Sequence, residues 1–224
     1  MGSITRNFAN NLTTSGLLKP TAFNNDSFDN VTSVSEGAIV GGNMVLLSTQ
    51  NPSAVSSVSF TTGIDSTYKE YIFMFSSIHA DSGGVNNYFT FNASTDGGSN
   101  YNVNKTTTSF ANYNDEAGGG THFFGYVAAN DLAESTGYQD LITFRQSDAV
   151  TDENYGGFLH IFDPASTTYV KHFISYGAHS NAGSFAVNNH IAGYLNTTSA
   201  VNAIDFKFDT GSNFTGTIQL FGIS

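Results

Sequence analysis

One short motif in the sequence could carry acid–base chemistry. Asp209-Thr210-Gly211 matches the turn that holds the catalytic carboxylate in aspartic proteases. Peptide hydrolysis by that route needs two carboxylates that share one proton, supplied by two such turns or by a symmetric dimer. The sequence has no second Asp-Thr-Gly. Because Asp, Thr and Gly are also the residues that an ordinary hairpin turn requires, we expect a turn here and not a protease site.

Histidine is the other residue type that could form a site, and the sequence has six: His79, His122, His160, His172, His179 and His190. His160 and His172 fall on opposite strands of an expected hairpin, which could begin a metal site. Neither has a carboxylate beside it in the sequence or belongs to a His-x-His pair. We favour half-buried strand histidines whose ring nitrogens are satisfied by neighbours, with metal binding as the alternative.

Other catalytic and cofactor motifs are missing from the sequence. It has no Gly-x-Ser-x-Gly, P-loop or dinucleotide fingerprint, and no cysteine for a thiolate nucleophile, a zinc site or a disulfide. Asp96-Gly97-Gly98-Ser99-Asn100 offers oxygen atoms that suit calcium, but one carboxylate falls short of a calcium loop. The sequence therefore predicts a protein that is not an enzyme and that uses no cofactor or metal.

Charge and hydropathy exclude two classes of partner. The formal net charge is −11, and the seven Lys and Arg residues are scattered singly, so no basic patch can follow the phosphates of a nucleic acid. No apolar run approaches the ~20 residues of a membrane helix. Residues 1–13 lack the basic start and the apolar block of a signal peptide. We expect a protein that is made in a cytoplasm and binds neither nucleic acid nor membrane.

The stretch around which the fold must be organised is Tyr68–Ile78, because its apolar residues alternate between two faces of an extended chain. One face carries Tyr71, Phe73 and Phe75, and the other carries Ile72, Met74 and Ile78. Both faces are therefore expected to be buried. Such a strand belongs in the middle of a sheet.

From Met44 onward the sequence consists of short extended runs that end at Gly, Asn, Asp or Pro. The expected strands are 44–49, 55–60, 68–78, 87–93, 101–110, 121–129, 139–146, 158–162, 168–174, 185–195, 201–208 and 214–222. Asp163-Pro164-Ala165-Ser166 turns the clearest hairpin, and the last two strands are expected to pair with one face solvated. Eleven or twelve strands without a helix predict an all-β fold, a two-sheet antiparallel β-sandwich of jelly-roll type over residues 44–224.

Residues 1–43 form an extended N-terminal arm in this interpretation, since Asn, Thr and Ser dominate and apolar residues are sparse. Such a segment cannot bury enough surface to order itself, so a partner must order it. Its apolar side chains are spaced to fit singly into pockets of a neighbouring protein. These candidate contact residues are Ile4, Phe8, Leu12, Leu17, Leu18, Phe23 and Phe28. We expect the arm to attach the folded domain to a partner, with a mobile leader without a role as the alternative.

Four segments of the sequence resemble a known group of proteins. They are residues 1–16 (MGSITRNFANNLTTSG), 24–32 (NNDSFDNVT), 59–71 (SFTTGIDSTYKEY) and 216–223 (GTIQLFGI). Together they are similar to the small structural proteins of marine tailed bacteriophages, including phages of cyanobacteria. The resemblance spans nearly the whole chain. Its motifs are turns and strands, so it implies no catalytic residue.

What the resemblance implies is a virion component of β-sandwich type: a head decoration protein, a head fibre or a tail appendage, made in the host cytoplasm. Its partners would be other capsid or tail proteins, bound through the arm. Because virion appendages repeat by symmetry, we expect a homo-oligomer and prefer a trimer. So many large apolar residues also exceed what one sandwich must hide. The alternative is a carbohydrate-binding jelly-roll module of a tail fibre or baseplate that contacts a glycan on the host surface.

Overall fold

The computed structural model describes residues 44–81, 87–146, 153–181 and 183–223, so the arm and its seven candidate contact residues lie outside the described residues. Within these ranges the chain forms twelve strands and the 3₁₀ turn η3 (Ala128–Asn130): β1 (Met44–Gln50), β2 (Ser57–Phe60), β3 (Glu70–Ala80), β4 (Phe89–Ser94), β5 (Lys105–Asp115), β6 (His122–Tyr126), β7 (Gln139–Asp140), β8 (Tyr155–Phe162), β9 (Lys171–Ser180), β10 (Phe185–Leu195), β11 (Ala203–Phe208) and β12 (Phe214–Ile223). Each expected strand is present near its expected position, although 139–146 is reduced to β7. No helix among the described residues is long and apolar enough to span a membrane.

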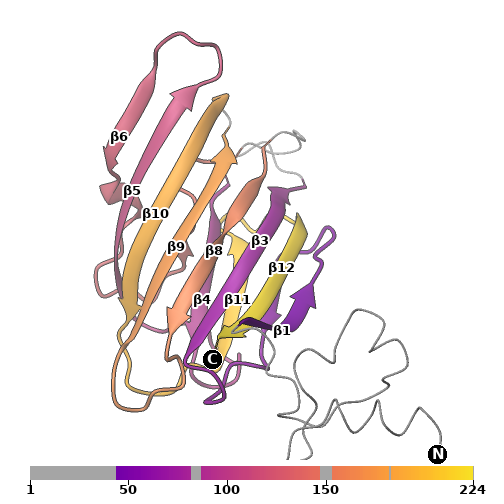
Figure 1. Ribbon diagram of the computed structural model, residues 1–224, viewed down its shortest axis with the longest axis vertical. Helices are drawn as coiled ribbons and strands as arrows, with labels where there is room; N and C mark the ends of the chain where they lie inside the picture. The colour runs from indigo at the N-terminus through magenta and orange to yellow at the C-terminus, as the bar shows by residue number, and fades with distance from the viewer. Residues whose placement is uncertain (1–43, 82–86, 147–152, 182, 224) are drawn as a thin grey trace, which may run out of the picture. The chain divides into compact units, whose positions relative to one another are not determined.

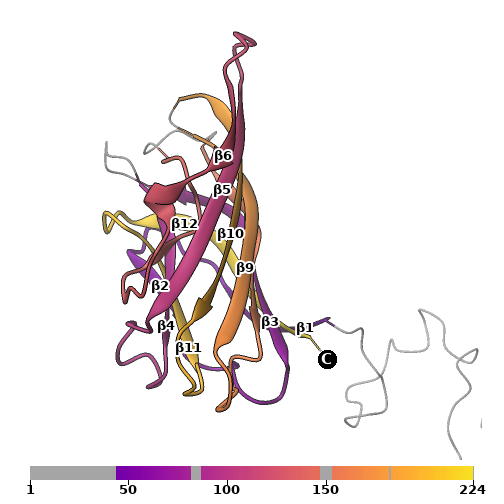
Figure 2. The same ribbon diagram turned by 90° about the vertical axis from the view of Figure 1, so that its left-hand side faces the viewer.

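The strands pair antiparallel into two sheets. The larger sheet has the order β1-β12-β3-β8-β9-β10-β5-β6, and the smaller has the order β2-β11-β4-β7. Figure 1 looks onto the larger sheet with β4 and β11 behind it, and Figure 2 shows the two layers from the side. The all-β, two-sheet sandwich is therefore confirmed. The jelly-roll type is not confirmed, because a jelly roll distributes eight strands over two sheets, whereas here eight strands share one sheet.

The core between the sheets consists mainly of aromatic rings. Phe206 of β11 lies 5.1 Å from Phe73 and 5.2 Å from Phe75 of β3, measured between ring centroids, and both pairs meet edge to face. Phe89 of β4 lies 5.4 Å from Phe75 in the same geometry. Edge-to-face pairs add roughly 0.5–1.5 kcal/mol each to the stabilisation by buried area. The aromatic side chains of the larger sheet and of the smaller sheet thus hold the two layers together.

Strand β3 is an interior strand, between β12 and β8, but only one of its faces is buried. Tyr71, Phe73 and Phe75 lie in the core, whereas Met74 is 40% exposed. A β-bulge between Phe75 and Ile78 breaks the alternation at Ser77, whose φ is 53°. The bulge turns Ile78 into the core, where it is fully buried. The prediction that both faces of this stretch are buried is wrong, because its second face belongs to the outer surface of the larger sheet.

The last two strands do not pair with each other. β11 lies between β2 and β4 in the smaller sheet, and β12 lies between β1 and β3 in the larger one. The outer side of β11 is also covered: the carboxylate of Asp205 accepts hydrogen bonds from the hydroxyl of Ser59 at 2.6 Å and from that of Tyr138 at 2.9 Å. The solvated face expected for this pair is therefore wrong for β11, which is buried on both sides at most positions.

Candidate functional site

The protease-like motif forms a turn that carries the chain from one sheet to the other. The carboxylate of Asp209 accepts a hydrogen bond from the backbone N–H of Tyr88 at 2.8 Å. The hydroxyls of Thr210 and Ser212 both donate to the side-chain carbonyl of Asn87. These polar groups tie the turn to the segment that precedes β4, so their contacts are structural.

The calcium-like segment is likewise closed on itself. One carboxylate oxygen of Asp96 accepts hydrogen bonds from the Ser94 hydroxyl at 2.6 Å and the Asn100 backbone N–H at 2.9 Å. The other accepts from the Asn100 side-chain amide at 2.7 Å. The bond from Ser94, and then those from Asn100, lower the pKa of Asp96 to about 2. The carboxylate therefore organises the turn that joins β4 to β5.

His160 and His172 lie on neighbouring strands but are not opposite each other, since the partner of His160 on β9 is Ile174. Nε2 of His160 lies 2.9 Å from a carboxylate oxygen of Glu70 on β3. This contact could not be predicted from the sequence, because β3 and β8 are far apart along the chain and meet only through their pairing in the sheet. Across the four described ranges, no group of three or more His, Asp or Glu side chains could hold a metal ion.

The outer face of the larger sheet carries a continuous row of ring and thioether side chains. The strand registers place six residues side by side across six strands. We call them the aromatic row: Met74, Phe158, Tyr176, His190, Phe110 and Tyr126. The rings of Phe110 and His190 stack at 4.8 Å, and Tyr176 lies 6.0 Å from His190. Phe124 extends the row at its end on β6, where it is 78% exposed.

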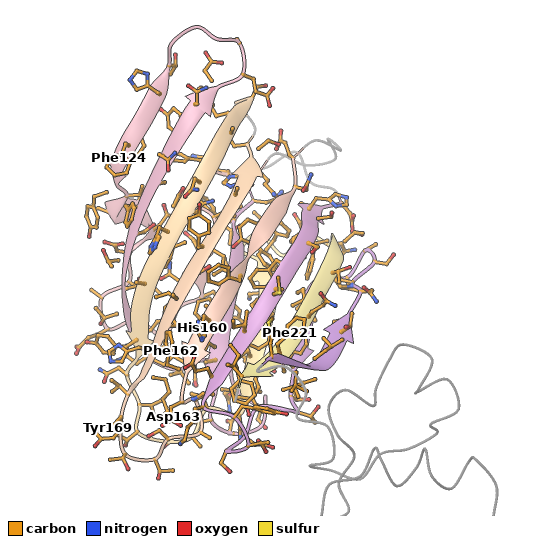
Figure 3. The ribbon with its side chains drawn as sticks, in the orientation of Figure 1. Phe124, His160, Phe162, Asp163, Tyr169 and Phe221 are labelled. Carbon is orange, nitrogen blue, oxygen red and sulfur yellow. The ribbon has the colours of Figure 1, made fainter. Side chains whose placement is uncertain are left out.

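A second row runs parallel to the first on the same face of the sheet, displaced by two residues along each shared strand. Its members are Leu46, Phe221, Ile72, His160, Ile174, Ala192 and Thr108. Figure 3 labels Phe124, His160 and Phe221 and shows how far they are spread, from β6 to β12. Neither row contains Asp, Glu, Lys or Arg. We define the two rows together with Phe124 as the outer aromatic face.

A shallow depression of about 410 Å³ lies on this face over β5, β10 and β9. It is lined by Thr106, Thr108, His172, Ile174, Ala192 and Tyr194, with the rings of His172 and Tyr194 6.1 Å apart. Gly193 lets β10 approach β5 closely, because a Cβ there would lie only 2.5 Å from the carbonyl oxygen of Thr106. The depression combines ring faces with hydroxyl groups.

The outer aromatic face presents mainly apolar side chains and rings, and the carboxylate of Glu70 contacts it at His160. The sequence did contain a signal for it: Phe158, His160 and Phe162 alternate with inward-facing residues that are also apolar. A strand that is apolar on both sides fits burial within the fold, as expected above for Tyr68–Ile78. The same pattern also fits a strand whose outer side is buried against another molecule.

None of the protein-family models, curated proteins or solved structures with which the chain was compared matches it significantly.

Proposed function

We propose that this chain is a non-enzymatic structural protein of a tailed bacteriophage particle and that it associates with further copies of itself through the outer aromatic face. The observation that carries the proposal is the width of that face: its two rows consist of apolar and ring side chains apart from Thr108, and they cross six and seven strands without Asp, Glu, Lys or Arg. Soluble monomers seldom expose apolar patches of this extent, whereas protein interfaces are rich in Tyr, Phe and Met.

The distribution of charge supports association through this face. With a net charge of −11, two copies repel each other over most of their surface. An interface between copies has to avoid Asp and Glu, and the two rows contain neither. Glu70 lies beside the second row, where its carboxylate contacts His160.

The assignment to a phage particle rests on the resemblance of four segments to phage structural proteins. A head decoration protein, a head fibre and a tail appendage all fit a β-sandwich with a polar arm at its N-terminus. In this proposal residues 1–43 attach the protein to the capsid or tail, and the outer aromatic face joins the copies, with a trimer as the preferred state.

The test introduces a negative charge at two positions of similar exposure, one on the outer aromatic face and one outside it. Phe124 on the outer aromatic face is 78% exposed and Tyr169 in the turn after β8 is 72% exposed, so neither substitution disturbs the core. Sedimentation equilibrium should show an oligomer for the native protein and for Tyr169→Asp, and a monomer for Phe124→Asp. Immunogold labelling of purified particles should locate the native protein on the head or tail. A monomeric native protein that is absent from particles would refute the proposal.

The depression on the same face favours one second candidate, a carbohydrate-binding module that contacts a host glycan. The half-buried ring of Tyr194 and the exposed ring of His172 can stack on a sugar, and the nearby Thr hydroxyls can hydrogen-bond to it. Glycan-array binding by the full chain, lost in Tyr194→Ala, together with a position at the tail tip, would favour this function. Head-bound copies without glycan binding would favour the structural role alone.

A further inference from the structure

A buried amine and a buried side-chain amide are in contact where the two sheets meet. Lys105 begins β5 of the larger sheet, and Asn92 lies on β4 of the smaller sheet. Both residues are fully buried. Nζ of Lys105 lies 2.8 Å from Oδ1 of Asn92 and 2.6 Å from the carbonyl oxygen of Gly137. The ion pairs seen in the described part of the chain do not include Lys105.

The amine of Lys105 is buried without a carboxylate as ion-pair partner, and this environment favours its neutral form. An ammonium ion that leaves water without gaining a counter-charge loses much of its solvation energy. Desolvation accordingly lowers the pKa of Lys105 to about 8. A desolvated, neutral lysine amine is a nucleophile.

The amide of Asn92 is held in a single orientation. Its Nδ2 donates hydrogen bonds to the carbonyl oxygens of Tyr101 at 2.7 Å and Thr136 at 3.0 Å. Its Oδ1 accepts from the backbone N–H of Ala93 at 2.9 Å as well as from Lys105. A backbone N–H in this position stabilises negative charge on Oδ1 during attack on the amide carbon. Nucleophile and amide are thus in contact before any reaction, which removes much of the entropic cost of bringing them together.

The strand next to Asn92 in the smaller sheet carries a buried carboxyl group. Asp205 on β11 is the register partner of Asn92, and it is only 4% exposed. Burial raises the pKa of Asp205, while hydrogen bonds from Ser59 and Tyr138 oppose the shift. A carboxyl group that holds its proton more tightly than usual can carry protons between two nitrogen atoms.

We propose that Lys105 and Asn92 form an intramolecular isopeptide bond. Nζ attacks Cγ of Asn92, the Cγ–Nδ2 bond breaks, and Nδ2 leaves as ammonia. The proton that Nζ loses is the proton that the departing nitrogen gains, carried by the carboxyl group of Asp205. The exchange consumes no oxidant, reductant or co-reactant. The new bond joins β4 to β5, and therefore the smaller sheet to the larger one, in a chain that has no cysteine for a disulfide.

The test is the mass of the full-length chain after prolonged incubation at pH 9, where most of the Lys105 amine is neutral. We expect a mass below that of the sequence by one ammonia, about 17 Da, as a covalent amine–amide exchange requires. After cleavage with chymotrypsin at Tyr101, which lies between the two residues, the peptides that contain Asn92 and Lys105 should remain joined. A chain that keeps the full sequence mass would overturn the proposal, since Lys105 would then only donate hydrogen bonds.

Four variants separate bond formation from a structural role of the same residues. Asn92→Asp should lose water instead of ammonia, so its final mass should equal that of the native product. Asn92→Ala should keep its full mass. Lys171→Met is the matched control, because Lys171 is also buried but its amine donates hydrogen bonds to the backbone carbonyl oxygens of Tyr169 and Thr197 and to no side-chain amide among the described residues. It should still lose ammonia. Asp205→Asn should slow the loss by at least about 100-fold, and an unchanged rate would remove Asp205 from the mechanism.

Discussion

At the scale of single residues, the ring of Tyr155 occupies the space that a side chain at Gly177 would need. Tyr155 is fully buried, and a Cβ at Gly177 would lie 2.3 Å from the edge of its ring. We expect Gly177→Ala to lower the free energy of unfolding by about 1–3 kcal/mol, because an overpacked core has to shift. Gly156→Ala is the control, since its Cβ would meet nothing closer than the carbonyl oxygen of Phe75 at 3.9 Å. Equal urea midpoints for the two variants would contradict this.

His179 makes the stability of the fold depend on pH. Its ring is buried, with Nε2 at the carbonyl oxygen of Phe144 and Nδ1 3.0 Å from the side-chain amide of Asn189. A neutral ring that donates from Nε2 and accepts at Nδ1 satisfies both contacts. Burial lowers the pKa of His179 to about 4, against 6.5 for a free histidine. Between these values the unfolded chain binds more protons than the folded one, so stability increases with pH there.

We expect the contribution of His179 to the free energy of unfolding to fall by roughly 2–3 kcal/mol as the pH drops from about 6.5 to about 4. Asp140 acts in the opposite direction, because burial raises its pKa to about 7 and the folded chain favours its protonated form. Urea denaturation of the native protein and of His179→Gln at each pH separates the two groups. If both proteins lose stability equally over this range, the histidine is not responsible.

At the scale of elements, the bulge in β3 gives two isoleucines of one strand opposite environments. Ile78 is fully buried beneath the bulge, whereas Ile72 lies on the outer aromatic face. We expect Ile78→Ala to cost about 2–5 kcal/mol of unfolding free energy through the cavity that it leaves. Ile72→Ala should cost less than about 1 kcal/mol in the isolated domain. Simple alternation predicts the same cost for both, so similar values would rule out the bulge.

The positions of most strands could be predicted from the sequence because the local signals agree. The expected strand 185–195 coincides with β10, and the turn at Asp163 leads from β8 towards β9, where the Ser166 backbone N–H bonds to the Asp163 carbonyl oxygen. Pairing was less predictable, since β12 pairs with β3 and not with its neighbour in sequence, β11. The bulge added a residue to β3 and so reversed the expected face of Ile78. The contact of Lys105 with Asn92 could not be predicted from the sequence pattern, because the two residues belong to different sheets and meet only through the packing of those sheets.

At the scale of the whole molecule, we expect the folded domain to supply the stability and the arm, residues 1–43, to supply the attachment to the particle. The buried hydrophobic core runs from Phe60 to Leu220, and β1, which begins at Met44, is the first strand of the larger sheet. We therefore expect a chain that lacks residues 1–43 to unfold in the same urea range as the full chain, within about 0.5 kcal/mol. We expect the same truncated chain to lose binding to purified particles, because the polar arm with its widely spaced apolar side chains is the proposed anchor.

A second variant distinguishes the loss of apolar contacts from the loss of chain length. It keeps all 224 residues and replaces Ile4, Phe8, Leu12, Leu17, Leu18, Phe23 and Phe28 by Ser. If these side chains enter pockets on the particle, the substituted chain should fail to bind as completely as the truncated one, while circular dichroism of both remains that of the native β-sandwich. Particles that take up the truncated chain at full occupancy would instead assign attachment to the sandwich itself. The outer aromatic face would then have to contact the particle as well as neighbouring copies, and Phe124→Asp should abolish both.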